Sequence, residues 1–233
     1  MKRHRLAVEP PLFRLVARTR VPQADVDADA DADADADAAL EAEEGDGAAI
    51  DGARVMLAVR GDRGALEALF RTHQRRVHRR VCRLMGPHPE VDDIVQDCFL
   101  TAFESLPKLS EPCAFSAWLL RIAVHKVHRR LRRERMLRRL GFVPAGDMLA
   151  ATNAAVSPML SPAQSAEARA IYALLDRFPT DARVAFVLRH LEGLTVPEVA
   201  QQTGLSERTV KRRVAMVEQA VAGIVELDSK VAL

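Results

Sequence analysis

The sequence predicts an all-α protein made of two small helical domains joined by a linker, and three observations lead to this fold class. Apolar residues make up 48% of the 233 residues and aromatic residues only 4%, so a core would consist mainly of Leu, Val and Ala. Gly and Pro cluster between segments of helical periodicity. No run rich in Val, Ile and Thr marks a β-strand.

The charge of the chain is unevenly distributed along its length. Residues 1–53 carry 6 basic and 13 acidic side chains, a net −7. Of the 34 basic and 32 acidic residues in the chain, the remaining 28 and 19 give residues 54–233 a net +9. An acidic segment before a basic body indicates a nucleic-acid partner.

The first 53 residues are expected to be disordered. The chain opens with basic residues, as signal peptides do, but Glu9, Pro10 and Arg14 interrupt the apolar residues that follow. No run of eighteen apolar residues occurs, so we expect a cytoplasmic protein. Residues 22–47 have low complexity, and every second residue from 25 to 37 is Asp. Like charges at this spacing repel and Ala buries little area, which predicts an acidic tether.

The tether has two interpretations. It is a spacer with no further role, or it imitates a polyanion and shields a basic surface of the same chain. In the second case, deleting residues 1–50 tightens DNA binding at low salt.

The first domain, residues 54–140, is predicted to begin with two amphipathic helices. One spans Arg63–Met85, with Asp62 as its N-cap and a stop at Gly86. Its remaining faces are basic, with Arg71, Arg75, Arg76, Arg79, Arg80 and Arg83. The next helix, Val91–Ser105, has an acidic start that complements the helix dipole or faces a basic protein partner.

The segment Cys113–Arg139 is predicted to be the central helix of this domain. Apolar residues recur at three- and four-residue steps in its first half. From Arg121 to Arg139 it carries nine Arg or Lys and a single acidic residue, Glu134. A solvated basic face usually interleaves acidic residues as i,i+4 partners, so this composition favours contact with nucleic acid over a solvated or protein-binding face.

Residues 141–166 are poor in charge and contain several Gly, Pro and Ser, so they are predicted to be a linker. The second domain, residues 167–228, is followed by a short tail, residues 229–233. It is expected to contain helices at 166–178 and 181–191. A capping box, Thr195 to Glu198, then opens the segment VPEVAQQTGLSERTVKRRVAMV.

This last segment has the pattern of a helix-turn-helix, with the turn at Gly204 and a second helix capped by Ser206. The second helix exposes side chains that reach base edges and phosphates. The alternative is a structural three-helix unit that does not bind DNA.

No metal site or cofactor is expected. The three cysteines, Cys82, Cys98 and Cys113, lack CxxC spacing and are interpreted as small buried residues. His125 and His128 lie three residues apart, but no carboxylate or Cys is spaced to join them as a ligand.

Four segments in order resemble the extracytoplasmic-function (ECF) group of bacterial sigma factors. GDRGALEALFRTHQRRVHRRV resembles the start of the family's region two, EVDDIVQDCFLTAF its polymerase-clamp motif and FSAWLLRIA its promoter-melting motif. LEGLTVPEVAQQTGLSERTVKRRV is similar to its region four. The resemblance covers residues 54–228 and implies a non-enzymatic initiation factor that directs core RNA polymerase to promoters.

The resemblance also implies roles for residues at matching positions. Polymerase would contact the acidic helix and an apolar groove, through Asp92, Asp93, Gln96, Asp97, Leu175, Phe178, Val184 and Leu188. The loop from Lys108 to Ala114 would capture a flipped base of the minus-ten element. The residues assigned to that element are Lys108, Trp118, Arg121, His125, Lys126, Arg129, Arg130, Arg132 and Arg133. The minus-thirty-five element would be read by Ser206, Glu207, Arg208, Thr209, Lys211, Arg212 and Arg213. An anti-sigma factor is a possible further partner, and no small-molecule substrate is expected.

The family usually has Asn where His125 stands, and an ionisable side chain there would make DNA melting depend on pH. Two rival interpretations remain. A stand-alone helix-turn-helix regulator would bind a palindrome as a dimer, but it leaves the acidic helix unexplained. A recombinase or transposase would need a nucleophilic Ser on an α/β domain or three metal-binding carboxylates.

Overall fold

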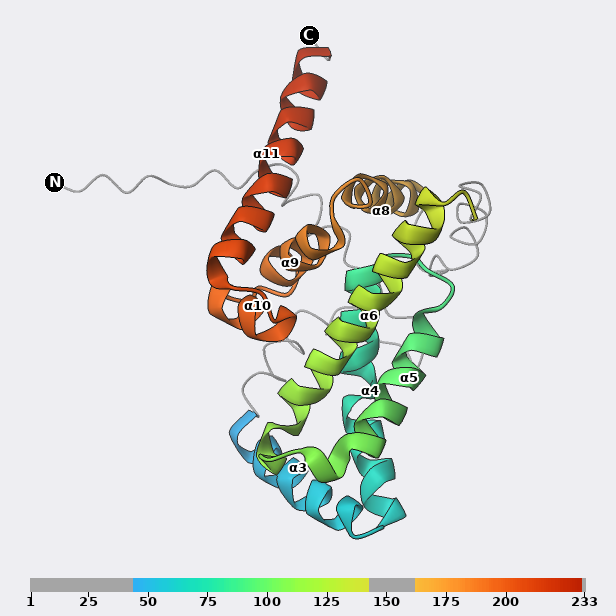
Figure 1. Ribbon diagram of the computed structural model, residues 1–233, viewed down its shortest axis with the longest axis vertical. Helices are drawn as coiled ribbons and strands as arrows, with labels where there is room; N and C mark the ends of the chain where they lie inside the picture. The colour runs from blue at the N-terminus through green and yellow to red at the C-terminus, as the bar shows by residue number, and fades with distance from the viewer. Residues whose placement is uncertain (1–43, 143–161, 232–233) are drawn as a thin grey trace, which may run out of the picture. The chain divides into compact units, whose positions relative to one another are not determined.

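The computed structural model describes residues 44–142 and 162–231, and within these it describes the side chains of 47–142 and 169–222 (Figure 1). The described residues divide into two compact units, 44–142 and 162–231, each of which we treat by itself. All regular elements in both are helical, which confirms the predicted fold class.

The first unit contains four α-helices and two short 3-10 turns. They are α3 (Glu44–Val59), α4 (Arg63–Met85), α5 (Val91–Ser105), η1 (Leu106–Lys108), η2 (Pro112–Ala114) and α6 (Phe115–Arg139). The central helix therefore starts two residues later than expected, because Pro112, Cys113 and Ala114 form a separate turn.

The core of the first unit lies between α4, α5 and α6, which pack against one another. Helix α4 begins as predicted, with the Asp62 carboxylate accepting a hydrogen bond from the backbone N–H of Ala65 at 3.1 Å. It ends at Gly86, whose φ of 75° lies in the region that favours glycine. Each of the three helices buries one apolar face; α6 buries Phe115, Leu119, Leu120, Ala123, Val124, Val127 and Leu131.

Helix α3 corrects the expectation that order begins near Ala53. The helix starts at Glu44, and it packs against α4, α6 and η2. Its contact is partly polar, because Asp51 is buried and bonds to Nε2 of His73 on α4 at 2.7 Å. A Cβ built on Gly52 would lie 2.7 Å from Sγ of Cys113, so a larger residue at position 52 would force this side chain to move where α3 and η2 approach each other. Residues 1–43 lie outside the described part.

The second unit holds α8 (Pro162–Leu175), α9 (Thr180–His190), α10 (Val196–Thr203) and α11 (Glu207–Val231). Helices α9, α10 and α11 pack together around buried valines, among them Val199, Val210 and Val217. Helix α8 starts inside the predicted linker, so the expected boundary at residue 166 was too late. The rest of that linker, 143–161, and residues 232–233 of the tail are not described.

The predicted local signals of the helix-turn-helix are confirmed. The backbone N–H of Thr195 donates to the Glu198 carboxylate at 2.7 Å, and the backbone N–H of Glu198 donates to the Thr195 hydroxyl at 3.5 Å. Gly204 adopts the left-handed conformation at the turn, with φ of 74°. The Ser206 hydroxyl then accepts from the backbone N–H of Thr209 at 3.3 Å.

Candidate nucleic-acid interface

One face of α6 is basic and exposed over most of its length. Its members lie at positions 121, 125 and 129 and at the adjacent positions 132 and 133, three and four residues further on, which places them in a row on the helix surface. This row, which we call the α6 stripe, consists of Arg121, His125, Arg129, Arg132 and Arg133. Within residues 44–142, none of its four arginines forms an ion pair, so their positive charge is available to an external polyanion.

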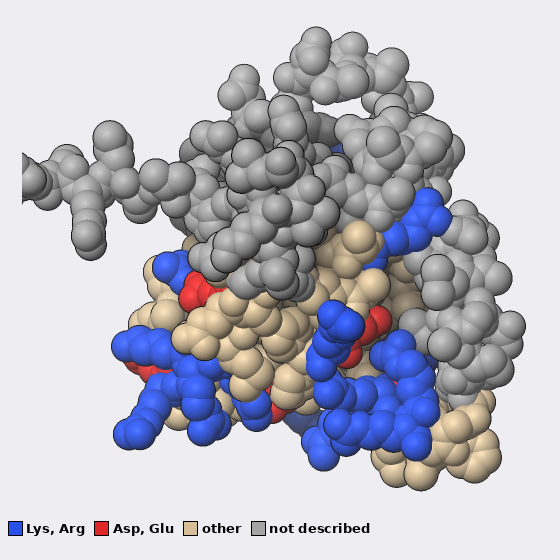
Figure 2. Space-filling view, turned by 90° about the horizontal axis from the view of Figure 1, so that it is seen from above, with Lys and Arg blue, Asp and Glu red and all other residues tan. Residues whose placement is uncertain are grey.

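In Figure 2, Lys and Arg side chains lie in separate groups, and acidic side chains are visible beside them. The ionisation of His125 adds little to the charge of the α6 stripe at neutral pH. Burial, and then the charges of Arg121, His128 and Arg129, lower the pKa of its imidazole below the ordinary value of 6.5. Any gain of charge by His125 therefore requires a more acidic pH than for an unperturbed histidine.

Two other residues predicted to hold DNA are engaged within the protein. The Nζ of Lys126 lies 2.6 Å from the carboxylate of Asp97, which was predicted to face polymerase. Arg130 makes two hydrogen bonds of 2.5 Å to the carboxylate of Glu90 and an ion pair of 3.0 Å with Glu134. Charge-assisted pairs of this kind fix the side chains on the flank of α6.

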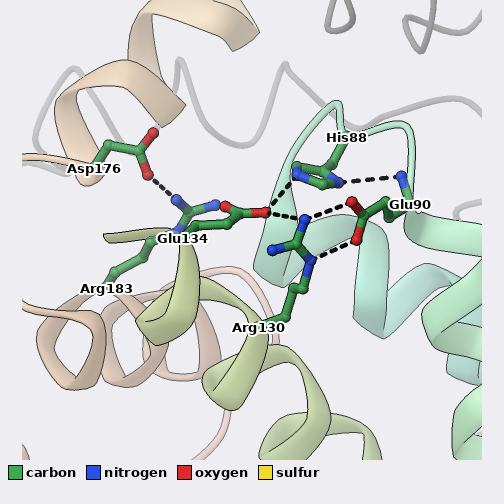
Figure 3. Close-up of polar contacts among 6 residues, drawn as sticks. All are labelled: His88, Glu90, Arg130, Glu134, Asp176 and Arg183. Atoms are coloured by element: carbon green, nitrogen blue, oxygen red, sulfur yellow. Dashed lines mark hydrogen bonds and ion pairs between the residues drawn. The ribbon is translucent and has the colours of Figure 1, made fainter. Parts of the chain in front are cut away.

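Glu134 lies at the centre of this network (Figure 3). Its side chain is only 6% exposed, and its Oε1 is 2.9 Å from Nε2 of His88 and 3.0 Å from Arg130. The backbone N–H of Glu90 donates to Nδ1 of His88, so the proton on Nε2 is directed at Glu134. The network fastens the loop between α4 and α5 to the distal half of α6.

The ionised form of Glu134 is favoured in this setting. Burial raises the pKa of its carboxyl, but the hydrogen bond from His88 and the neighbouring cations outweigh burial and leave the pKa below 4.5. The hydrogen bond from Arg130 likewise lowers the pKa of Glu90. The sequence showed Glu134 as the only acid among nine cations, but not that its partners lie on the neighbouring loop.

The loop predicted to capture a base runs through η1 and η2 into α6. Lys108 is exposed in this loop. Trp118 is half-buried and stacks at a tilt on Phe115, with 6.1 Å between ring centroids. Arg76 of α4 donates to the Ser116 hydroxyl at 3.2 Å, so the side of the loop next to α6 is supported from α4.

The predicted acidic surface forms one exposed face of α5. Asp92, Asp93, Gln96 and Asp97 are all exposed, and the apolar side chain of Leu100, 55% exposed, continues the same face. Of these residues, Asp92 approaches His78 at 3.3 Å and Asp97 pairs with Lys126. An acidic face that ends in an exposed leucine suits a basic protein surface.

In the second unit, most of the predicted recognition residues are exposed on the first turns of α11. They are Ser206, Glu207, Arg208, Lys211 and Arg212, with Thr209 half-buried. Arg213 differs, because its guanidinium lies 3.6 Å from Asp181 of α9 and the side chain is 23% exposed. It therefore helps to hold α11 to α9.

The predicted apolar groove is wrong for three of its four residues. Leu175 is 2% exposed, and Val184 and Leu188 are fully buried, because they form the core of the second unit. Only Phe178 is half-buried. Sequence reasoning also missed Arg183, a buried arginine that pairs with Asp176 and lies 5.6 Å from the ring of Tyr172 (Figure 3).

Two of the three cysteines are unsuited to act as nucleophiles. Burial raises the pKa of the Cys82 and Cys98 thiols to about 12, so both stay protonated. Cys113 is exposed, which contradicts the prediction that all three are buried.

Among the described residues, no group of His, Cys, Asp and Glu is arranged to hold a metal ion. None of the helices in this part of the chain is long and apolar enough to cross a bilayer.

The geometry defines an all-helical protein with a basic stripe and an acidic face on one unit and a helix-turn-helix on the other. Residues 69–136 match the family described as sigma-70 region 2, and residues 168–220 match sigma-70, region 4. The chain is 31% identical to the ECF RNA polymerase sigma factor SigM of Mycobacterium tuberculosis, over 70% of this chain and 79% of that one. It is 30% identical to the RNA polymerase sigma factor NccH of Alcaligenes xylosoxydans xylosoxydans, over 76% and 96%.

Two solved structures share the fold. CnrH in complex with the cytosolic domain of CnrY has a TM-score of 0.51 and 23% identity, covering 76% of this chain and 98% of that one. RpoE in complex with the anti-sigma factor NepR, from Bartonella quintana, has a TM-score of 0.51 and 20% identity, covering 70% and 97%. The chain belongs to the ECF group of sigma-70 family RNA polymerase sigma factors. It is a promoter-directing factor and not a stand-alone regulator.

Proposed function

We propose that the two faces of the first unit divide the work of initiation between polymerase and DNA. The acidic face of α5 binds basic helices of core RNA polymerase. The α6 stripe binds the melted strand of the minus-ten element and the duplex beside it. The observation that carries this division is that α5 and α6 pack side by side, while Asp92 and Asp93 are exposed on one and Arg129 and Arg132 on the other.

Strand separation would follow from binding alone. A base that leaves the stack costs a few kcal/mol, and a cationic groove with a stacking platform recovers that cost. The α6 stripe supplies the cations, and the loop from Lys108 to Ala114, with Trp118 on the first turn of α6, supplies the platform next to them. Sigma factors are non-enzymatic initiation factors, and this mechanism needs no hydrolysis.

The exposed start of α11 would read the minus-thirty-five element. Arg208, Lys211 and Arg212 are on the outer face of a helix that follows a tight turn, which is the arrangement of recognition helices in the major groove. Since Arg213 is tied to Asp181, its share in reading DNA is smaller than the sequence suggests.

An anti-sigma factor and a cytoplasmic location complete the proposal. CnrH and RpoE are each bound to another protein in their solved structures, CnrY and the anti-sigma factor NepR. This chain shares their fold, and the exposed Leu100 on the acidic face offers an apolar contact for a protein partner. Transcription takes place in the bacterial cytoplasm, where this chain would meet polymerase.

The test is binding of the purified protein to bacterial core RNA polymerase. The variant Asp92→Arg, Asp93→Arg should lose affinity at least tenfold, because it reverses two charges on the acidic face. Asp97 is left unchanged, since its loss would also release Lys126. The matched control is Glu67→Arg, which reverses an exposed acid on α4 and should bind as the parent does. Equal affinity of all three proteins would refute the assignment of the acidic face.

A further inference from the structure

We propose that the aspartates at positions 25–37 dock on the α6 stripe of the same chain and compete with DNA for it. The inference rests on the proposed function in taking the α6 stripe as the DNA site. The docking itself is a property of the free protein and is measured without DNA or polymerase.

The first argument is charge complementarity. On α6, the flanking cations Lys126 and Arg130 already have carboxylate partners, whereas the four arginines of the stripe have none within residues 44–142. Residues 25–37 carry seven aspartates, and no Lys or Arg occurs between positions 21 and 53. The acidic segment and the α6 stripe therefore carry opposite charge within one chain and can neutralise each other.

The second argument is position. The aspartates end seven residues before Glu44, where α3 begins. Helix α3 packs against α6 and η2, and its Gly52 touches Cys113, two residues before α6 (Figure 1). The acidic segment is thus joined to the fold close to the end of α6 at which the stripe begins.

The third argument is length and spacing. Asp25 and Glu44 are 19 positions apart, so the chain between them spans at most about 65 Å, whereas Arg121 to Arg133 spans about 18 Å of helix. Alternate residues of an extended chain lie about 6.6 Å apart. Residues four apart on α6 rise about 6 Å. Successive aspartates can therefore face successive cations of the stripe.

The size of the effect follows from effective concentration. A segment tied this closely is present at about 1 mM near the stripe. If it binds with a Kd of about 0.1 mM, which is the weak end of non-specific ionic binding, it lowers the affinity for DNA about tenfold. Salt screens the contact, so the effect should shrink as ionic strength rises.

The experiment compares the full chain with a variant in which all seven aspartates from Asp25 to Asp37 are changed to Asn. The first readout is the pKa of His125, followed by NMR at 50 mM salt without DNA. Carboxylates docked on the stripe would raise this pKa, so the variant should show a value lower by about 0.5. His73, which is buried against Asp51, serves as the internal reference.

The second readout is the affinity for a 20-nucleotide oligo-dT. The Asn variant should bind about tenfold more tightly at 50 mM salt, and the gain should largely vanish at 300 mM. A control variant, Glu67→Gln with Glu104→Gln, removes exposed acids from α4 and α5 and should change neither readout beyond a small shift in affinity.

An unchanged His125 pKa would overturn the inference, because it would show that the aspartates do not occupy the stripe. If oligo-dT binding were nevertheless tighter in the variant, the gain would come from overall charge, or from pairing of the aspartates with the six basic residues in positions 1–20. The NMR readout involves neither promoter nor polymerase. It therefore tests the docking of the aspartates even if the proposed roles in promoter binding are refuted.

Discussion

Helices α6 and α11 are both 25 residues long and both are proposed to bind DNA, yet they are held in place by different means. Helix α6 has an apolar root and a buried charged network around Glu134 near its far end. The described part of α11 relies on buried valines and on two partly exposed pairs with α9, Arg213 with Asp181 at 3.6 Å and Glu218 with His190 at 2.9 Å. The comparison shows that neighbouring cations on one helix differ: some are exposed and without an ion pair in the described part of their own unit, and others are paired with carboxylates and fasten the helix.

The largest expected effect concerns the charged network of α6. Changing Glu134 to Ala leaves Arg130 and His88 without their buried partner and should lower the free energy of unfolding by about 3 kcal/mol. Urea denaturation measures the change. The control Glu67→Ala removes an exposed i,i+4 partner of Arg71 and should cost less than about 0.5 kcal/mol. Similar losses for the two variants would mean that the network does not anchor α6.

On α11 the comparison predicts two classes of arginine. Arg212→Ala, or equally Lys211→Ala, should weaken binding of a minus-thirty-five duplex by about 1–2 kcal/mol, because an exposed contact to DNA is lost. Arg213→Ala should affect DNA binding less and thermal stability more, since it breaks the pair with Asp181. Fluorescence anisotropy and thermal denaturation of the same proteins separate the classes. Unchanged duplex binding in the Arg212 and Lys211 variants would contradict the recognition-helix assignment.

A smaller effect is expected for single cations of α6. Arg129→Ala should reduce the salt dependence of oligo-dT binding by about 0.7 in the log–log slope, the value for one phosphate contact on a single strand. Lys126→Ala should change the slope less, because Lys126 is paired with Asp97. Titrations at four salt concentrations measure both slopes. Equal changes in slope would remove the distinction between stripe and flank.

The smallest effect is a pH dependence of the contact between α3 and α4, which His73 of α4 makes with Asp51 of α3. Burial lowers the pKa of His73 below 6.5, although the charge of Asp51 and its hydrogen bond act in the opposite direction. Below pH 6.5 the unfolded chain therefore takes up a proton that the folded chain does not. The contribution of His73 to the free energy of unfolding should therefore be constant above this pH and should fall below it. Urea denaturation between pH 7.5 and 5.5 should show this decline in the parent and a weaker one in His73→Gln. The same decline in both proteins would assign it to other groups.

The sequence was sufficient wherever the signal was local. The caps at Asp62 and at Thr195 with Glu198 are specified by residues three apart, and both formed as predicted. The exposed faces of α5 and α6 likewise follow from helical periodicity. Whether a charged side chain on α6 is already paired depends on residues 29 to 46 positions away: Asp97 for Lys126, Glu90 for Arg130 and His88 for Glu134. Periodicity carries no information about these partners.

Two errors have the same physical origin. Helix α3 was missed because Gly and Ala dominate its first turns, and its buried contacts, Asp51 with His73 and Gly52 with Cys113, depend on tertiary packing. Leu175, Val184 and Leu188 were assigned to a groove for a partner, but apolar residues on short helices first fill the core of their own unit. A resemblance identifies positions, and only packing decides which of them remain exposed.

The two attachments of α6 make the helix fix a distance between its ends. Its root at Phe115 and its anchor at Glu134 are 19 residues apart, which is about 28 Å of continuous helix. A rod pinned at both ends neither pivots nor bends easily. Under the proposed function, the helix therefore fixes the distance between the base held beside Phe115 and the phosphate held beside Glu134. Promoters for this factor should accordingly tolerate changes of sequence more readily than changes of length within that interval.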